Sequence, residues 1–318
     1  MCTIATLTLS PALDKSTHVA GLVPDRKLHC ARPTVDAGGG GINVSRGLRR
    51  LGTLSVAVFP AGGPAGRCLQ DLLAAEGIAH RVVPIQDATR ENFVVLDTAT
   101  HQQYRFGMPA ARLTPAEQHE VLVACAQFVR RPELLVVSGS LPPGVSPTFL
   151  GKVVRQARQA GTKVIVDTSG PALRHAIEAG AYLIKPNLRE LNELTGGPAL
   201  DRAAVPGAAR ELLKNSSCEA VVVSLGPDGA CLVTRDGEDF VPAPPVTRRS
   251  TVGAGDSLVA GLVHALAQGQ GLPEAVRLGV ACGTAATLNP GTELFHRADA
   301  ERLYQKLLQT MPAAGVAA

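Results

Sequence analysis

Short apolar runs alternate with longer segments of helical pattern from Leu134 onward. The runs at residues 134–138, 163–167, 182–185 and 220–225 predict buried strands, and the segments at 147–159, 171–178, 188–194 and 205–214 predict the helices between them. Strands and helices at this spacing are typical of βαβ units, so we expect an α/β fold whose parallel sheet is covered by helices on both faces. Ligands of such sheets bind at the carboxyl ends of the strands.

Two segments interrupt this alternation. Residues 17–35 are charged and are broken by Pro24 and Pro33, and residues 92–97 and 102–106 predict a β-hairpin. Together they predict a small antiparallel sheet added to the main one. A chain of 318 residues is long enough for one large α/β domain. We therefore expect a single domain over residues 1–318, with a lid formed by about residues 14–35 and 88–108.

Composition excludes several classes of protein. The net charge of +4, with 18% charged residues, is too mild for a nucleic-acid or membrane-surface protein, and no apolar run approaches the roughly 18–20 residues of a membrane span. The seven cysteines are scattered without a Cys-x-x-Cys pair, which favours reduced thiols over zinc or disulfides. Residues 1–7 predict a strand rather than a signal peptide, and residues 312–318 predict a frayed end. We expect a cytoplasmic protein.

The stretch from Ser250 to Ser257 carries the strongest chemical signal, because its glycines directly precede an apolar helical segment at 258–267. Backbone N–H groups can converge there on a phosphate, and the helix dipole adds positive potential. Asp256 stands beside this nest, where a carboxylate can accept the proton of an attacking hydroxyl. The alternative is a plain helix cap, with Asp256 as the capping residue and the glycines as a tight turn.

A second glycine cluster, Gly38 to Gly41, precedes Asn43 and a further helix. Such a loop either binds phosphate or simply turns a corner. Four charged residues lie in or beside the proposed lid: Asp14, Lys27, Arg90 and Arg105. Each alone is typical of a solvated surface charge, whereas three cations converging on a cleft would suit an anionic sugar phosphate.

Two further turns follow predicted strands. Asn187 and Glu190 face one side of a first helical turn, where they suit Mg²⁺ held through water or, alternatively, a capping box. The turn from Ser224 to Gly229 suits nucleotide phosphates or, alternatively, an ordinary hairpin turn.

The chain carries these motifs in an order along the sequence that resembles that of the ribokinase-like phosphofructokinase-B family of carbohydrate kinases. The two most specific marks are Gly39 to Asn43 and Thr251 to Asp256, and the similarity extends from about Ile4 to about Tyr304. The resemblance implies a sheet flanked by helices, a β-lid over the sugar, ATP as phosphoryl donor, Mg²⁺ and a monovalent cation such as K⁺. It also implies small-molecule substrates, with neither a nucleic-acid nor a membrane partner. Edge pairing of an exposed lid predicts a homodimer through the lid.

The resemblance implies a role for each matching residue. Asp256 would be the base, beside the anion hole of Gly253, Ala254 and Gly255. The sugar phosphate would contact Asp14, Lys27, Gly39, Gly40, Gly41, Asn43, Arg90, Arg105, Ser140 and Asp256. ATP would contact Lys185, Asn187, Ser224, Leu225, Gly226, Pro227, Asp228, Gly229, Arg248, Arg249, Ser250 and Thr251. Asn187 and Glu190 would hold Mg²⁺ through water, and K⁺ would lie near Ser250, Val252, Ala286, Asn289 and Gly291.

Within the family, the chain is most similar to the minor B-type branch, which phosphorylates fructose 6-phosphate. The supporting stretches are residues 6–14, 59–63 and 138–144. Relatives that act on fructose 1-phosphate or tagatose 6-phosphate usually carry lysine in place of Gly40, where we expect open space. Kinases for those two sugars remain alternatives, as does a non-catalytic sugar-phosphate sensor, which would have no need of Asp256. Arg189 and Arg248 depart from the B-type pattern, and Glu293 adds a charge near the cation loop.

Overall fold

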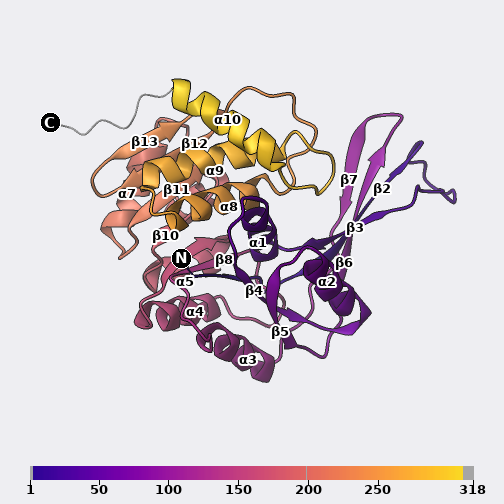
Figure 1. Cartoon of the computed structure of the whole chain (residues 1–318), viewed down its shortest axis with the longest axis horizontal. Helices are drawn as coiled ribbons and strands as arrows, with labels where there is room; N and C mark the ends of the chain where they lie inside the picture. The colour runs from indigo at the N-terminus through magenta and orange to yellow at the C-terminus, as the bar shows by residue number, and fades with distance from the viewer. Residues whose placement is uncertain (1–2, 198, 311–318) are drawn as a thin grey trace.

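Two separate sheets organise the chain in the computed structural model, which describes residues 3–197 and 199–310 (Figure 1). The expected frayed end at 312–318 lies outside the described residues. The main sheet has nine strands, in the order β13-β12-β11-β10-β9-β8-β1-β4-β5. Their bounds are β1 (Ile4–Leu7), β4 (Val56–Ala61), β5 (Ala79–Pro84), β8 (Leu134–Ser138), β9 (Lys163–Asp167), β10 (Leu183–Ile184), β11 (Ala220–Ser224), β12 (Ala230–Thr234) and β13 (Glu238–Val241). In the order given, every pair of neighbouring strands from β11 to β5 is parallel. At the other edge, β12 pairs antiparallel with β11, and β13 pairs antiparallel with β12.

Helices cover both faces of this sheet, as the alternation predicts (Figure 1). Strand β8 shows why: Leu135 and Val137 point into one core with residues of α3 to α7, while Leu134 and Val136 point into a second core with α1 and α8 to α10. The helices are α1 (Gly40–Arg50), α2 (Gly63–Ala75), α3 (Pro115–Ala126), α4 (Thr148–Gln159), α5 (Gly170–Glu178), α6 (Leu188–Thr195), α7 (Val205–Lys214), α8 (Ala254–Ala267), α9 (Leu272–Ala286) and α10 (Arg297–Thr310). The predicted mostly parallel α/β fold is confirmed.

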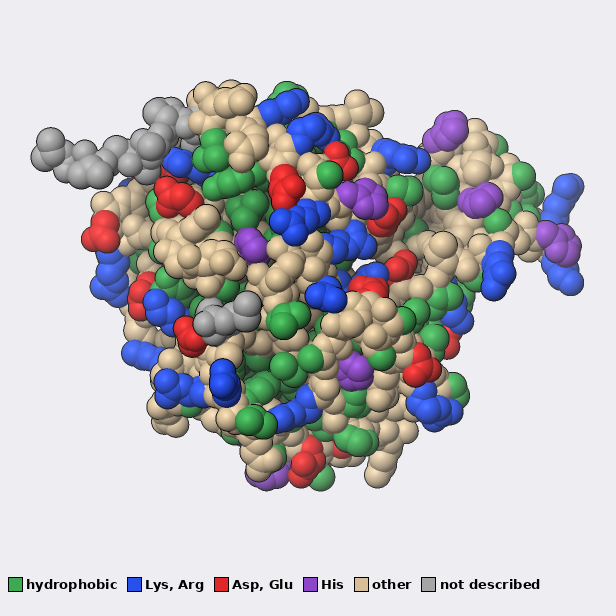
Figure 2. Space-filling model, in the orientation of Figure 1, with side chains coloured by type: hydrophobic (Ala, Val, Ile, Leu, Met, Phe, Trp, Pro, Cys, Tyr) green, Lys and Arg blue, Asp and Glu red, His purple; other side chains and the backbone are tan. Residues whose placement is uncertain are grey.

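The second sheet, here called the lid sheet, has the strand order β3-β2-β6-β7 and projects from the main body (Figure 1 and Figure 2). Its strands are β2 (Ala12–Val19), β3 (Thr34–Gly38), β6 (Arg90–Asp97) and β7 (Gln102–Phe106). The predicted hairpin is β6 and β7, but the expectation of a wholly antiparallel sheet is wrong, because β2 and β6 run parallel. The chain crosses through α1, β4, α2 and β5 between them, and a parallel pair requires such a crossover.

Within residues 3–197 and 199–310, no helix has the length and apolar character that a membrane span requires.

Candidate active site

The N-terminus of α8 lies at the centre of the candidate site. Gly253 adopts φ +72° at the cap position and supplies no side chain to the first amides of the helix. Those amides are therefore free to bind an anion. Asp256 lies in the first helical turn rather than at the cap, so the alternative of a simple capping aspartate is wrong.

Two hydrogen bonds hold the Asp256 carboxylate. Asn43 Nδ2 donates to Oδ2 at 2.9 Å, and Ser138 Oγ donates to Oδ1 at 3.4 Å. Burial of the carboxyl group and the nearby negative charge of Asp167 raise the pKa of Asp256 to about 7, against the opposing effects of Asn43, Lys185 and Ser138. Asp256 can thus gain or lose a proton near neutral pH, as a general base must.

The first glycine cluster lets α1 approach the strand ends. A Cβ on Gly41 would lie 2.6 Å from the Leu7 carbonyl oxygen, and a Cβ on Gly40 would lie 2.3 Å from Ser138 Oγ and 2.8 Å from the Gly139 nitrogen. The expectation of open space at Gly40 is therefore wrong, because the carboxyl end of β8 fills it. The close approach brings Asn43 of α1 to Asp256.

Asp14 and Arg90 meet at the base of the lid sheet. Asp14 accepts a hydrogen bond from Asn92 Nδ2 at 2.9 Å, and burial raises its pKa despite that bond and the nearby Arg90. Arg90 donates to the carbonyl oxygens of Ser10 (3.1 Å) and Met108 (3.3 Å). Its Nε is buried without a hydrogen-bond partner among the described residues, so one donor of the guanidinium is left unsatisfied.

The other predicted cations lie elsewhere. Lys27 follows the far end of β2, beyond Val19, and Arg105 is exposed on β7, where its guanidinium donates to Gln103. The structure thus brings Arg90 alone of these three cations to Asp14. Ser140 is exposed two residues beyond β8.

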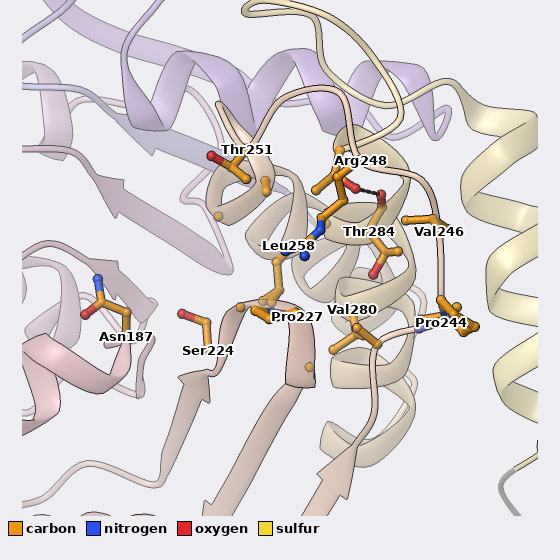
Figure 3. A pocket seen from close by; sticks show the side chains of 18 residues that line it. Asn187, Ser224, Pro227, Pro244, Val246, Arg248, Thr251, Leu258, Val280 and Thr284 are labelled. Atoms are coloured by element: carbon orange, nitrogen blue, oxygen red, sulfur yellow. Dashed lines mark hydrogen bonds between the residues drawn. The ribbon is translucent and has the colours of Figure 1, made fainter. Parts of the chain in front are cut away.

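A cavity of about 520 Å³ opens beside the N-terminus of α8, between the β11–β12 turn, α8 and α9 (Figure 3). Seven predicted nucleotide contacts line it: Asn187, Ser224, Gly226, Pro227, Gly229, Arg248 and Thr251. The turn from Ser224 to Gly229 also joins the antiparallel strands β11 and β12, so it is a hairpin connection as well as part of the cavity wall. Leu225, Asp228, Arg249 and Ser250 adjoin this lining without belonging to it.

Sequence reasoning missed the apolar wall of the cavity. Its apolar residues are Ala243, Pro244, Pro245, Val246, Leu258, Val280 and Gly283, and the polar Thr284 and Thr287 complete the wall. The proline-rich stretch after β13 and the small residues of α9 were the available signals. Because Ala254 and Gly255 also line the cavity, its apolar part is continuous with the α8 amides, an arrangement that suits a flat heterocycle joined to phosphates.

Lys185 lies close to Gly255 at the start of α8, outside the cavity lining. Its Nζ is 3.0 Å from Asp167 Oδ1 and would lie 3.8 Å from a Cβ on Gly255. Burial alone would lower the pKa of Lys185, but Asp167 more than offsets burial, and the pKa is raised. A permanent positive charge therefore stands next to the anion nest.

Asn187 and Glu190 form a capping box, which is one of the two arrangements that the sequence predicted for this pair. Asn187 Oδ1 accepts from the Glu190 N–H, and Glu190 Oε2 accepts from the Asn187 N–H, both at 2.9 Å. The capping box leaves Glu190 Oε1 for a metal-bound water, and Asn187 is one of the residues that line the cavity (Figure 3). Within the described ranges, no group of three His, Cys, Asp or Glu side chains has metal-binding geometry.

The structure also brings together the two segments of the predicted cation loop. Ser250 Oγ donates to the Gly291 carbonyl at 2.8 Å, and the Asn289 N–H donates to the Ala286 carbonyl at 3.2 Å. Each carbonyl oxygen keeps a second lone pair, and oxygen donors of this kind fit a hard cation. Glu293 pairs with His296 at 3.2 Å, and Arg189 is exposed beside Glu193.

Comparison with known proteins agrees with this geometry. The model of the "pfkB family carbohydrate kinase" matches residues 8–298. ATP-dependent 6-phosphofructokinase isozyme 2 of Mycobacterium tuberculosis is 43% identical over 95% of this chain and 89% of its own length, and that of Escherichia coli is 42% identical over 96% and 99%. The 1-phosphofructokinase of Rhodobacter capsulatus is 33% identical over 92% of each chain.

Solved structures of phosphofructokinase-2 from E. coli share the fold, and each covers 96% of this chain and 99% of its own. The complex with potassium has a TM-score of 0.93 at 42% identity, and the complex with fructose-6-phosphate has 0.91 at 40%. A tetrameric inhibited form has 0.90 at 41%. The chain belongs to the pfkB family of carbohydrate kinases.

Proposed function

We propose that this chain transfers the γ-phosphoryl group of ATP to fructose 6-phosphate, giving fructose 1,6-bisphosphate and ADP. The observation that carries this proposal is the position of Asp256 at the start of α8. The neighbouring Ala254 and Gly255 line a cavity that suits a nucleotide, and Asn43, which bonds Asp256, follows a glycine loop that packs against Asp14 at Gly38. The relatives with the highest identity given above are named as ATP-dependent 6-phosphofructokinases, whereas the 1-phosphofructokinase is more distant.

In the proposed reaction, the sugar C1 hydroxyl oxygen attacks the γ-phosphorus. The bond to the β–γ bridging oxygen breaks, ADP leaves, and the hydroxyl proton passes to an Asp256 oxygen. Asn43 and Ser138 orient that carboxylate. The α8 amides and Lys185 stabilise the negative charge that gathers on the transferred group.

Each remaining part of the site has a proposed role. Asp14 and Arg90 bind the sugar phosphate. Lys27 from the β2–β3 connection and Arg105 from β7 reach it as the lid closes, and closure excludes water. Asn187 and Glu190 hold Mg²⁺ through water. When bound, this ion neutralises the phosphate oxygens. The loop of Ser250, Val252, Ala286, Asn289 and Gly291 holds K⁺, an ion present in the E. coli structure.

We further propose a cytoplasmic homodimer that pairs through the lid sheet. The six cysteines of the described chain carry free thiols, as a reducing compartment favours. Exposed apolar side chains gather on the lid sheet and the segments beside it: Val23, Phe93, Tyr104, Phe106 and Met108. A protein surface rarely leaves such a group uncovered.

Turnover of competing sugars at fixed MgATP tests the assignment. We expect kcat/KM to be highest for fructose 6-phosphate, lower for tagatose 6-phosphate, and far lower for fructose 1-phosphate, whose misplaced phosphate leaves the half-buried Arg90 without an anion. A higher kcat/KM for fructose 1-phosphate contradicts the substrate and leaves the kinase intact. No ATP turnover with any hexose phosphate contradicts the reaction itself.

A further inference from the structure

Thr292 lies in the loop between α9 and α10 and contacts the lid sheet. Its hydroxyl donates to Asp36 Oδ2 at 3.2 Å and lies 3.2 Å from Ser16 Oγ. Since an ionised carboxylate only accepts, the Thr292 proton points to Asp36 and the Ser16 hydroxyl donates to Thr292. Thr292 therefore bridges β3 and β2 from outside the sheet.

Asp36 is itself fixed from the other side by Arg46 of α1. Arg46 Nη2 donates to Asp36 Oδ1 at 3.0 Å, and Nη1 donates to the Ala37 carbonyl at 2.9 Å. Its Nε contacts both Glu76 oxygens at 2.9 and 3.0 Å, and the Arg46 side chain is only 5% exposed. A buried guanidinium with this many partners has one geometry, so Asp36 is a rigid anchor for Thr292.

The same loop also contacts the segment that leads into α8. The Gly291 carbonyl accepts from Ser250 Oγ at 2.8 Å, and Ser250 Oγ in turn accepts from the Val252 N–H at 3.2 Å. Gly291 adopts φ +62°, and a Cβ there would lie 3.5 Å from Ser16 Oγ. One loop thus packs against β2 on one side and against the entry to the anion nest on the other.

We propose that Thr292 is a positioning residue that couples the sugar-phosphate and nucleotide halves of the site. Its partner Asp36 is in register with Asp14 on the adjacent strand, and Ser250, bonded to Gly291, precedes Thr251 in the nucleotide cavity. A ligand that orders either end of this chain of contacts lowers the cost of ordering the other end, so each ligand tightens the binding of its partner. This inference rests on the proposed function.

Calorimetric titration measures the coupling directly. The probe is a non-hydrolysable MgATP analogue, titrated with and without saturating fructose 6-phosphate, and the ratio of its two dissociation constants is the coupling factor. Thr292→Val keeps the volume and removes the hydroxyl, Thr292→Ser keeps the hydroxyl, and Thr195→Val is the control, because the Thr195 hydroxyl bonds only within α6.

We expect a wild-type coupling factor of about fivefold or more, within the usual range for coupled sites. Thr292→Val should bring it close to one while each single-ligand dissociation constant changes less than about twofold, and Thr292→Ser should retain it. A wild-type factor in Thr292→Val overturns the proposal, as does an equal loss in Thr195→Val.

Hydrogen exchange decides the same point without ligands. If Thr292 couples the two halves, Thr292→Val accelerates amide exchange both in β2 and at residues 250–253. Acceleration confined to the loop at 287–296 overturns the coupling. If no hexose phosphate gives a heat of binding in the calorimetric titration, the proposed function fails. The hydrogen-exchange pattern of Thr292→Val needs no ligand, so it still tests the role of Thr292.

Discussion

The Asp256 carboxylate is subject to opposing influences. Burial and the charge of Asp167 favour its neutral form, while hydrogen bonds from Asn43 and Ser138 and the charge of Lys185 favour the ionised form, and the resulting pKa is about 7. A general base acts only when ionised. We therefore expect kcat/KM to rise with pH through an apparent pKa near 7 and to level off above it. A pH–rate profile that is flat from about pH 5.5 to 8.5 would contradict this.

Removing the ionisable group tests the same residue. Asp256→Asn is nearly isosteric and should preserve the fold and ligand binding while lowering kcat by about 10²- to 10⁴-fold, the usual effect of losing a general base. The residual kcat/KM of Asp256→Asn should no longer rise with pH near 7. Single-turnover rates, with the dissociation constant of an ATP analogue as the control, check this result. Near wild-type turnover would remove Asp256 from the mechanism.

Sequence motifs located the start of α8 and placed Asp256 beside it, as the structure has them, because a glycine-rich stretch before a helix is a local signal. They assigned Asn43 to the sugar, whereas the structure bonds it to Asp256, and they missed the Ser138 contact. Both contacts join residues more than one hundred positions apart, and no local pattern encodes such a meeting. The prediction of open space at Gly40 was wrong for the same reason, because the carboxyl end of β8, distant in sequence, fills that space.

At the turn from β10 to α6, two substitutions can distinguish the helix-capping role of Asn187 and Glu190 from their proposed role in binding Mg²⁺. Asn187→Ala removes the cap acceptor and should lower the free energy of unfolding by about 1 kcal/mol. Glu190→Gln keeps an oxygen that can accept from the Asn187 N–H, so stability should change little. The lost charge should instead raise the Mg²⁺ concentration needed for half-maximal activity. Denaturant unfolding and Mg²⁺ titration of both variants check this, and an unchanged Mg²⁺ requirement in Glu190→Gln would argue for a cap alone.

The elements of the main sheet were largely predictable, and those of the lid sheet were not. Continuous apolar runs such as Leu134–Ser138 are strands because both faces are buried, and α7 was predicted with its observed bounds. The parallel pairing of β2 with β6 joins Ala12 to Arg90, and neither strand carries a pattern that selects its partner or direction. Pairing of that kind depends on tertiary packing.

For the whole molecule, the two faces of the lid sheet have different chemistry. Asp14 and Asn92 are cross-strand neighbours on one face, and Lys15 and Phe93 are the next pair, on the opposite face. Phe93 is directly opposite Phe106, and Tyr104 is two positions from Phe106, so these aromatic side chains share the face turned away from Asp14. They are 37–45% exposed. This face is the surface that we expect a second copy of the chain to cover.

Phe106→Asp places a charge at the edge strand of that face and should dissociate the homodimer that we propose. Losing a buried aromatic side chain costs about 1.5–3 kcal/mol, before the cost of burying a charge, so the dimer dissociation constant should rise at least about tenfold. Sedimentation velocity over a concentration series measures this shift. Val129→Asp is the matched control, because Val129 is fully exposed between α3 and β8, away from the lid sheet. A wild-type monomer, or an equal shift in both variants, would rule out pairing through this face, whereas a shift in Phe106→Asp alone would assign the interface to the lid sheet.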